Sequence, residues 1–174
     1  MLVSALMPTA NRRALAPLAL GSFAAQDWPE KELIVVDDGE DSIWDLCSQI
    51  DGVRYIRLIG RSTIGAKLNL AAVLAGGKIL VRWDDDDWSA QGRLRDQAER
   101  LERSGKSVTG YHSLLFWTGK EATRCRNGTQ VSHGTALCFR RTYWQAHHFP
   151  DSSVREDLQF IEPGPLMPQA FARR

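Results

Sequence analysis

Four consecutive aspartates, residues 84–87, are the part of this 174-residue sequence best suited to chemistry. Two carboxylates about 6 Å apart repel each other by roughly 3 kcal/mol at an effective dielectric near 20, so this run needs a counter-charge. At a strand end, Asp84 and Asp86 would point to one side and Asp85 and Asp87 to the other. Such a pair of oxygen ligands suits Mg²⁺ or Mn²⁺ when substrate phosphates complete the coordination shell.

Two alternative roles for the acidic run fit the sequence less well. It could be a solvated acidic turn that caps the next helix, but it follows a buried apolar run and lies between Trp83 and Trp88. An EF-hand loop is excluded because Ser89 stands where the required glycine would be. Neither a G-x-G-x-x-G motif nor a P-loop follows any predicted strand. Phosphate must therefore be held in another way, and a carboxylate-bound cation can do this.

Two more polar segments directly follow predicted strands. Residues 8–12 read Pro-Thr-Ala-Asn-Arg, and residues 37–39 read Asp-Asp-Gly. In an open parallel sheet, ligands bind outside the carboxyl ends of the strands, so both segments should share an edge with residues 84–87. Asp-Asp-Gly is also a good turn in any fold, which leaves a structural role as the alternative.

A second acidic pair, Glu156-Asp157, lies near the end of the sequence. Ser153 to Glu156 match a capping box, which gives Glu156 a structural explanation. Asp157 would then lie in the first turn of a helix, where the helix dipole favours its anionic form. A carboxylate kept ionised at neutral pH can act as a general base.

The order of the predicted elements indicates the fold class. Strands are predicted at residues 2–7, 32–36, 53–58 and 78–83, and helices at residues 14–26, 42–50, 66–75 and 92–104. Strands that alternate with helices predict an α/β fold, in which a mainly parallel sheet is flanked by helices through right-handed crossovers.

The second half of the sequence has a different pattern. It predicts strands at residues 107–117, 121–125 and 136–140, and helices at residues 142–147 and 154–161. This small mixed part should be built onto the edge of the first half. We predict one domain over residues 1–162 and a loosely held tail at 163–174.

Composition excludes several classes of function. The net charge is +1, and the basic residues of 93–106 are interspersed with acidic ones, which predicts a solvated helix face and no nucleic-acid binding. Three cysteines without a C-x-x-C pair predict neither a disulfide framework nor a zinc site. No apolar run approaches the roughly 20 residues of a membrane span.

Taken in order, these motifs resemble the family 2 glycosyltransferases of the GT-A fold. The matching segments are Val-Ser-Ala-Leu-Met-Pro-Thr-Ala-Asn-Arg (3–12), Gln-Asp-Trp-Pro (26–29), Glu-Leu-Ile-Val-Val-Asp-Asp-Gly (32–39), Gly-Ala-Lys-Leu-Asn (65–69), Trp-Asp-Asp-Asp-Asp-Trp (83–88) and Arg-Glu-Asp (155–157). The resemblance implies a nucleotide-binding half at residues 1–88 and an acceptor and catalytic half at 89–162.

The resemblance also implies roles for particular residues. The acidic run would be the DXD motif, with Asp86 as first metal ligand and Asp84 or Asp85 assisting at the metal or ribose. Asp157 would be the general base, in a catalytic pair with Glu156. The nucleotide sugar would be bound by Pro8, Thr9, Asn11, Arg12, Asp37, Asp38, Lys67, Asp84 and Asp85. His133 is a further candidate for the site.

The implied reaction is an inverting sugar transfer that depends on Mn²⁺ or Mg²⁺. The donor would be a nucleotide-diphosphate sugar, with a UDP-sugar favoured, and the acceptor a hydroxyl group on a glycan or a lipid-linked molecule. The implied setting is cytoplasmic synthesis of envelope polysaccharide, with peripheral contact at the inner membrane face and an oligomer or partner protein left open. The alternatives are a catalytically impaired remnant that binds nucleotide sugar or a partner, and a sugar nucleotidyltransferase.

Two features depart from the family pattern. Ala10 stands where an aromatic residue commonly follows the Pro-Thr step, so Trp28 or another ring would have to stack on the base. Only 17 residues follow Asp157, where family members usually carry more chain for the acceptor site and a lid. The expected consequences are a minimal acceptor site, a site completed by a partner, or lost activity.

Overall fold

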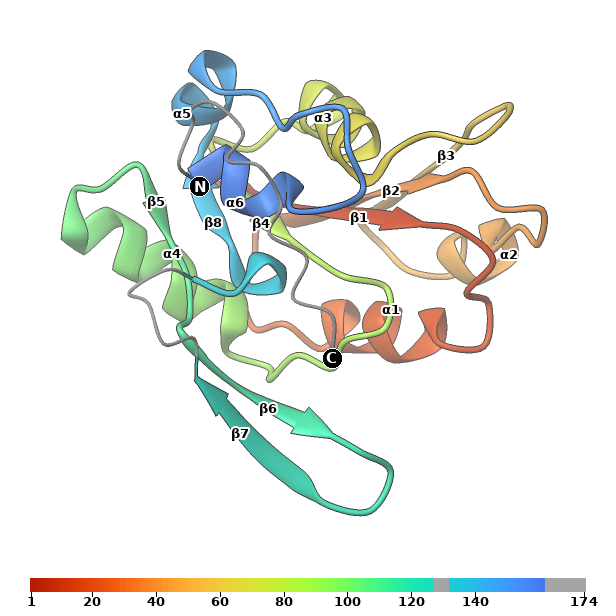
Figure 1. The fold of residues 1–174 in the computed structure, drawn as a ribbon, viewed down its shortest axis with the longest axis horizontal. Helices are drawn as coiled ribbons and strands as arrows, with labels where there is room; N and C mark the ends of the chain where they lie inside the picture. The colour runs from red at the N-terminus through yellow and green to blue at the C-terminus, as the bar shows by residue number, and fades with distance from the viewer. Residues whose placement is uncertain (127–131, 162–174) are drawn as a thin grey trace, which may run out of the picture.

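The computed structural model describes residues 1–126 and 132–161, and its centre is a six-stranded sheet in the order β3-β2-β1-β4-β8-β5 (Figure 1). The predicted tail at 163–174 lies outside the described residues. Four strands are parallel: β1 (Val3–Thr9), β2 (Lys31–Asp37), β3 (Val53–Arg57) and β4 (Ile79–Arg82). The antiparallel β8 (Cys138–Arg140) lies between β4 and β5 (Val108–Thr109). The predicted α/β class is confirmed.

Helices cover both faces of this sheet (Figure 1). Successive strand residues face opposite sides, so Ala5 joins one apolar core and Leu6 the other. The first core packs under α1 (Ala16–Ala24), α2 (Trp44–Cys47) and α4 (Arg93–Ser104). The second packs under α3 (Ile64–Leu74), α5 (Arg141–Ala146) and α6 (Glu156–Ile161). The two cores hold the sheet between the helix layers. The polar segments at residues 8–12, 37–39 and 84–87 follow the carboxyl ends of its parallel strands.

Some predicted boundaries were wrong. The helix predicted at 42–50 is reduced to the four residues of α2. The strand predicted at 107–117 is split into β5 and β6 (Ser113–Trp117), which belong to two different sheets. The strand predicted at 136–140 begins only at Cys138, since Gly134–Ala136 form a 3-10 turn.

The hairpin formed by β6 and β7 (Ala122–Arg126) is a sheet of its own. Its two strands pair in antiparallel register from Ser113–Arg126 to Trp117–Ala122. In Figure 1 the hairpin projects away from the six-stranded sheet and from the helices that cover it.

The antiparallel direction of β8 decides which segment lies next to the acidic run. Leu80 pairs with Phe139, and the Arg82 amide donates a 2.9 Å hydrogen bond to the Leu137 carbonyl. Because β8 runs opposite to β4, the residues that precede β8 lie at the edge where β4 ends. Gly134–Ala136 are thereby placed beside residues 84–87.

No helix among the described residues is long and apolar enough to cross a membrane.

Candidate functional site

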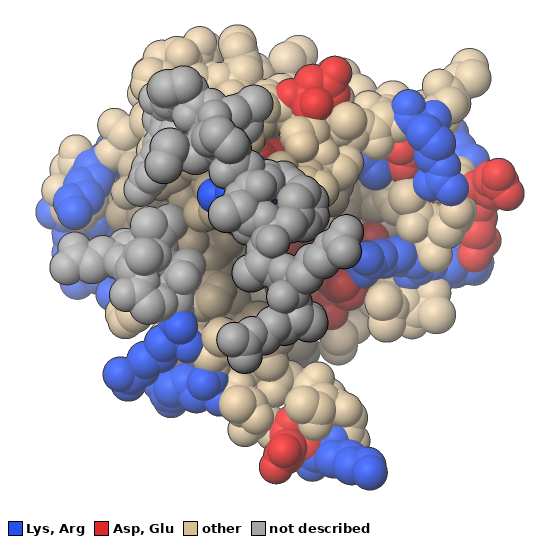
Figure 2. Space-filling view, viewed as in Figure 1, with Lys and Arg blue, Asp and Glu red and all other residues tan. Residues whose placement is uncertain are grey.

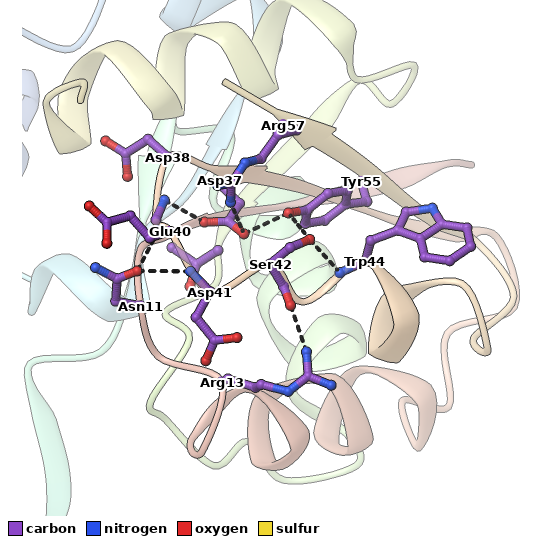
Figure 3. A network of polar contacts seen from close by, with 12 residues as sticks. Asn11, Arg13, Asp37, Asp38, Glu40, Asp41, Ser42, Trp44, Tyr55 and Arg57 are labelled. Carbon is purple, nitrogen blue, oxygen red and sulfur yellow. Dashed lines mark hydrogen bonds and ion pairs between the residues drawn. The ribbon is translucent and has the colours of Figure 1, made fainter. Parts of the chain in front are cut away.

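The loops that follow β1 and β2 are locked together by Asn11. Its Oδ1 accepts hydrogen bonds from the amides of Glu40 (2.6 Å) and Asp41 (3.2 Å), and its backbone is left-handed, with φ of 55° (Figure 3). Gly39 lies so close to the Asn11 backbone that a Cβ there would overlap it. The side chain of Asn11 therefore shapes the rim of the site, and its predicted contact with a nucleotide sugar stays a prediction.

Asp37 is buried, and both of its carboxylate oxygens are engaged (Figure 3). Oδ1 accepts from the Gly39 amide at 2.8 Å, which closes the turn after β2. Oδ2 accepts from the Tyr55 hydroxyl at 2.6 Å and from Arg57 at 3.2 Å, which ties β2 to β3. These contacts give Asp37 a structural part in the site.

Asp38 forms a buried ion pair with Lys67 of α3, whose Nζ lies 2.7 Å from Asp38 Oδ1. The same Nζ donates to the Thr9 carbonyl at 2.9 Å, and the Ser62 amide donates to Asp38 Oδ2 at 2.7 Å. Burial alone would raise the pKa of Asp38, but the bonds from Lys67 and Ser62 outweigh it and hold this pKa below its ordinary value. Lys67 thus fastens the ends of β1 and β2 to α3.

The run of four aspartates does not continue the strand. The strand ends at Arg82, and Asp85 and Asp86 lie in a turn. Each carboxylate has its own partner: Asp84 the Arg82 Nε (2.8 Å), Asp85 the Thr9 hydroxyl (2.6 Å), Asp86 the Arg12 guanidinium, and Asp87 the Thr135 hydroxyl (2.7 Å). Because the turn lies within the run, the strand-like alternation of its side chains stays a prediction.

Charge in this cluster is only partly balanced. Burial, with repulsion from neighbouring carboxylates, raises the pKa of Asp85 and of Asp87. The negative charge of Asp85, followed by that of Asp86, raises the pKa of the Arg12 guanidinium, although partial burial opposes this. Arg12 therefore acts as a counter-ion at the exposed end of the run. Excess negative charge is what a bound cation would offset.

The donor set fits a divalent cation that is shared with a substrate. Within residues 1–126 and 132–161, no group of three or more His, Cys, Asp or Glu side chains could hold a metal ion alone. Mg²⁺ commonly takes one or two carboxylates and completes its shell with water and substrate phosphates. Asp86, whose side chain is 41% exposed, and the less exposed Asp84 offer the oxygen atoms for this arrangement.

Glu156 does not take part in a capping box. The Ser153 hydroxyl accepts from the Ile64 amide instead, and α6 begins at Glu156 itself. The buried Glu156 carboxylate accepts from Arg82 Nη1 at 2.9 Å. Arg82 therefore bridges Glu156 and Asp84, and it connects the first turn of α6 to the acidic run across 74 positions of sequence.

Asp157, the next residue of α6, lies against Gly134. A Cβ added at Gly134 would overlap the Asp157 carboxylate oxygen Oδ2. Gly134 precedes Thr135, whose hydroxyl donates to Asp87. The predicted general base and the predicted metal-binding run therefore meet at the segment that leads into β8. The sequence analysis did not assign Gly134 or Thr135, although it flagged the adjacent His133.

Arg93 is a further residue that the sequence analysis missed. It was assigned to a solvated helix face, but its guanidinium lies over the Trp83 ring, 4.7 Å from the ring centroid. It donates to the carbonyls of Arg82 (2.7 Å) and Thr135 (2.6 Å), and burial lowers its pKa. Arg93 therefore positions the end of β4 relative to Thr135, a role that only the folded packing reveals.

Two ring residues have environments that the sequence does not reveal. Trp28 lies at the other edge of the sheet, where its Nε1 donates to the Met1 carbonyl at 3.0 Å, so it cannot stack at the carboxyl edge. The His133 Nε2 is buried and has no hydrogen-bond partner among the described residues. The centroid of its ring lies 6.3 Å from the centroid of the Phe116 ring, in an edge-on arrangement.

Comparison with known sequences identifies one family. The model of glycosyl transferase family 2 matches residues 4–153. Over 99 residues the chain is 36% identical to the colanic acid biosynthesis glycosyl transferase WcaA of Escherichia coli (strain K12), a match that covers 53% of this chain and 35% of that protein. This chain therefore matches only about a third of the length of that curated relative.

Solved structures show the same fold at lower identity. Residues 1–349 of the S. aureus protein TarS, in complex with UDP, superpose with a TM-score of 0.71 at 21% identity, and the match covers 92% of this chain and 54% of that 1–349 chain. The mannosyltransferase PcManGT from Pyrobaculum calidifontis, in complex with GDP-Man and Mn²⁺, superposes with a TM-score of 0.66 at 20% identity. This match covers 87% of this chain and 49% of the PcManGT chain.

Proposed function

Because this chain belongs to glycosyl transferase family 2, we propose that it transfers a sugar from a nucleotide-diphosphate sugar to an acceptor hydroxyl, with inversion and with the help of a divalent cation. The fold is the one that the resemblance implied, a mainly parallel sheet flanked by helices, as in TarS and PcManGT. The observation that carries the proposal is that the acidic run and Asp157 meet at Gly134 and Thr135.

Support for a nucleotide-sugar donor comes from the arrangement of the carboxyl edge. The ends of β1 and β2 are joined there through Lys67 and Asp38, and Thr9 reaches the buried Asp85. TarS has been solved with UDP and with UDP-GlcNAc, and PcManGT with GDP-Man. We propose that the base and ribose bind along this edge, with a UDP-sugar as the favoured donor. Pro8, Asn11 and Arg12 would complete the contacts.

The proposed cation would be held by Asp86 and Asp84. When bound, Mn²⁺ or Mg²⁺ offsets the negative charge that develops on the departing diphosphate. Arg12 already holds Asp86 by an ion pair and could serve the same diphosphate as a second positive group. The Mn²⁺ in the PcManGT complex supports a divalent cation in this type of fold.

The proposed bond-making step uses Asp157 as the base. The acceptor oxygen attacks the anomeric carbon, its proton passes to the Asp157 carboxylate, and the bond between that carbon and the diphosphate oxygen breaks. Attack opposite the leaving group inverts the anomeric configuration. Glu156 is held in its ion pair with Arg82, so we propose that it positions α6 and that Asp157 alone takes the proton. The glycan or lipid-linked acceptor and the cytoplasmic setting stay predictions.

A sugar nucleotidyltransferase is disfavoured by the loop after β1. That activity calls for a glycine- and basic-rich phosphate loop, whereas residues 8–13 hold no glycine and are locked by the side chain of Asn11. An inactive remnant that binds nucleotide is distinguished from an enzyme by slow hydrolysis of a nucleotide sugar that stops when a chelator is added.

Replacement of Asp86 tests the metal site. A nucleotide sugar that binds only the native state stabilises it, by about 2.7 kcal/mol when the ligand concentration is about 100 times Kd. The melting temperature rises as a result. We expect UDP-sugars with Mn²⁺ to produce this shift in the unmodified protein and Asp86→Ala to lose its Mn²⁺-dependent part. Asp41→Ala, an exposed aspartate of the loop after β2, serves as the control. An unchanged Mn²⁺-dependent shift in Asp86→Ala would refute the site.

Replacement of Gly134 tests the position of the base. In Gly134→Ala the new Cβ would displace the Asp157 carboxylate, and a misplacement of about 1 Å can cost roughly 10²-fold in rate. We expect release of UDP from a UDP-sugar to slow by about this factor while the donor-induced thermal shift is kept. Gly21→Ala is the matched control, because a Cβ there meets nothing within 4 Å. Equal rates in both variants would contradict the arrangement.

A further inference from the structure

The β6–β7 hairpin has one face that combines apolar and basic side chains. Residues directly opposite each other in an antiparallel pair share a face of the sheet. Leu115 pairs with Arg124, Trp117 with Ala122, and Ser113 with Arg126. Since alternate residues of a strand share a face, Leu115, Trp117, Arg124 and Arg126 all lie on the same side of the hairpin. We refer to these four residues as the hairpin face.

The hairpin face is turned away from the body of the protein. Leu115 and Trp117 are 66% and 68% exposed, and Arg124 and Arg126 are exposed as well. Phe116 lies on the opposite face, where its ring contacts that of His133. Large apolar side chains that gather on a projecting element usually mark an interaction surface.

Charge favours an anionic partner for this surface. Residues 113–126 contain three basic residues and one acidic residue. Figure 2 shows Lys and Arg side chains beside the base of the hairpin and at its tip. His112, which directly precedes β6, lines a cavity of about 840 Å³ together with Arg100, Arg103 and Lys106. The basic region therefore extends from the hairpin onto the end of α4.

We propose that the hairpin face docks on the surface of an anionic lipid bilayer. Tryptophan rings favour the boundary between headgroups and hydrocarbon, where Leu115 can also be buried. Arginine side chains can place their stems along apolar groups while their guanidinium groups stay among the lipid phosphates. Each basic residue near such a surface strengthens binding by about fivefold.

A second copy of the chain fits this face less well than a bilayer does. A second copy carries the same positive charge on this face, so face-to-face pairing would bring two basic surfaces together, and like charges across a contact oppose association. A bilayer carries the opposite charge and accepts the apolar side chains as well. The inference goes beyond the sugar-transfer proposal, because it concerns where the protein lies and does not depend on the donor chemistry.

The test is co-sedimentation of the full chain with lipid vesicles in the absence of any nucleotide. We expect binding to vesicles of phosphatidylcholine mixed with phosphatidylglycerol and little binding to phosphatidylcholine alone. Arg124→Gln/Arg126→Gln should weaken binding to the anionic vesicles by about 25-fold. Leu115→Ser/Trp117→Ser should weaken it by about tenfold or more. High salt should weaken the binding of the unmodified protein.

Two matched variants serve as controls. Trp44→Ser removes another exposed tryptophan, whose ring points away from Asp37 in Figure 3. Arg54→Gln/Lys78→Gln removes two positive charges from a different surface. Both should bind anionic vesicles as the unmodified protein does. The proposal is overturned by equal binding to both kinds of vesicle, by no binding, or by controls that lose as much as the hairpin variants.

An unchanged melting temperature in the hairpin variants shows that they are folded. Vesicle binding is measured without donor, so its outcome is independent of the sugar-transfer proposal. A chain that binds UDP-sugar but no vesicles overturns only the docking proposal, and a chain that binds vesicles but no nucleotide sugar overturns only the proposed function. Capture of a protein by the hairpin face without vesicle binding also contradicts the proposal.

Discussion

Asp157→Asn should reduce the rate of sugar transfer by about 10²- to 10⁴-fold, the usual contribution of a positioned general base. Asparagine keeps the size of the side chain and fits against Gly134, but it cannot accept the acceptor's proton. Donor binding should be unchanged, because the acidic run and the Lys67–Asp38 pair are untouched. The measurement is UDP release from a UDP-sugar, with and without candidate acceptors, beside the donor-induced thermal shift.

The control for this substitution is Asp151→Asn, another carboxylate close in sequence, which accepts from the Thr63 hydroxyl outside the acidic run. It should keep nearly full activity. If Asp157→Asn loses donor binding together with activity, Asp157 has a structural role and no role as a base. If the variant keeps its activity, another group takes the proton.

Lys67→Met should lower the stability of the fold more than any other single change considered. Removing one partner of a buried ion pair typically costs about 3–5 kcal/mol, because the other charge stays buried without compensation. Both side chains of this pair are almost fully buried, and Lys67 also holds the Thr9 carbonyl. For a chain of this size, a loss of about 4 kcal/mol lowers the melting temperature by roughly 10 °C.

Two companion variants make this experiment decisive. Lys67→Met/Asp38→Asn removes the orphaned charge and should recover part of the loss, whereas Lys78→Met, on the surface, should stay within about 0.5 kcal/mol of the unmodified protein. A double variant no more stable than Lys67→Met would show that the cost comes from packing and not from charge.

The same pair predicts a dependence on pH. The pKa of Asp38 is lower in the folded protein than its ordinary value, so its contribution to stability is fully present above the ordinary pKa near 3.8. That contribution is lost as the pH falls below this value and through the folded pKa. The penalty of Lys67→Met should therefore be largest near neutral pH and shrink in acid. A penalty that stays constant down to acidic pH would argue against the ion pair as its cause.

Local signals in the sequence predict the first half of the fold well. The apolar runs that become β1, β2 and β4 are bounded by Pro8, by Asp37-Asp38-Gly39 and by the acidic run, and each boundary agrees with the structure to within two residues. Alternation of these strands with helices was sufficient to predict a parallel sheet. The location of ligand-binding segments at its carboxyl edge follows from the same reasoning.

Contacts between distant residues could not be predicted in this way. The capping box at Ser153 to Glu156 is a sound local pattern, but Glu156 gains more from the buried Arg82 that tertiary packing brings to it. Arg93 appears in a helix with alternating charges, and only the stacking of α4 on Trp83 shows that its guanidinium is enclosed. Gly134 has no signal beyond its neighbour His133, because its importance lies in the space it leaves for Asp157.

The antiparallel pairing of β4 with β8 has a consequence for how the protein tolerates change. Side chains alternate at each step of about 3.3 Å, so a slip of one residue would carry Thr135 away from Asp87 and turn Phe139 out of its core. The proposed base, Asp157, and the proposed ion-binding run, residues 84–87, are thus kept in alignment by three residue pairs between β4 and β8. Substitutions in β8 that shift this pairing by one step would separate the two proposed groups and expose Phe139 at once, so loss of activity and a lower melting temperature should appear together.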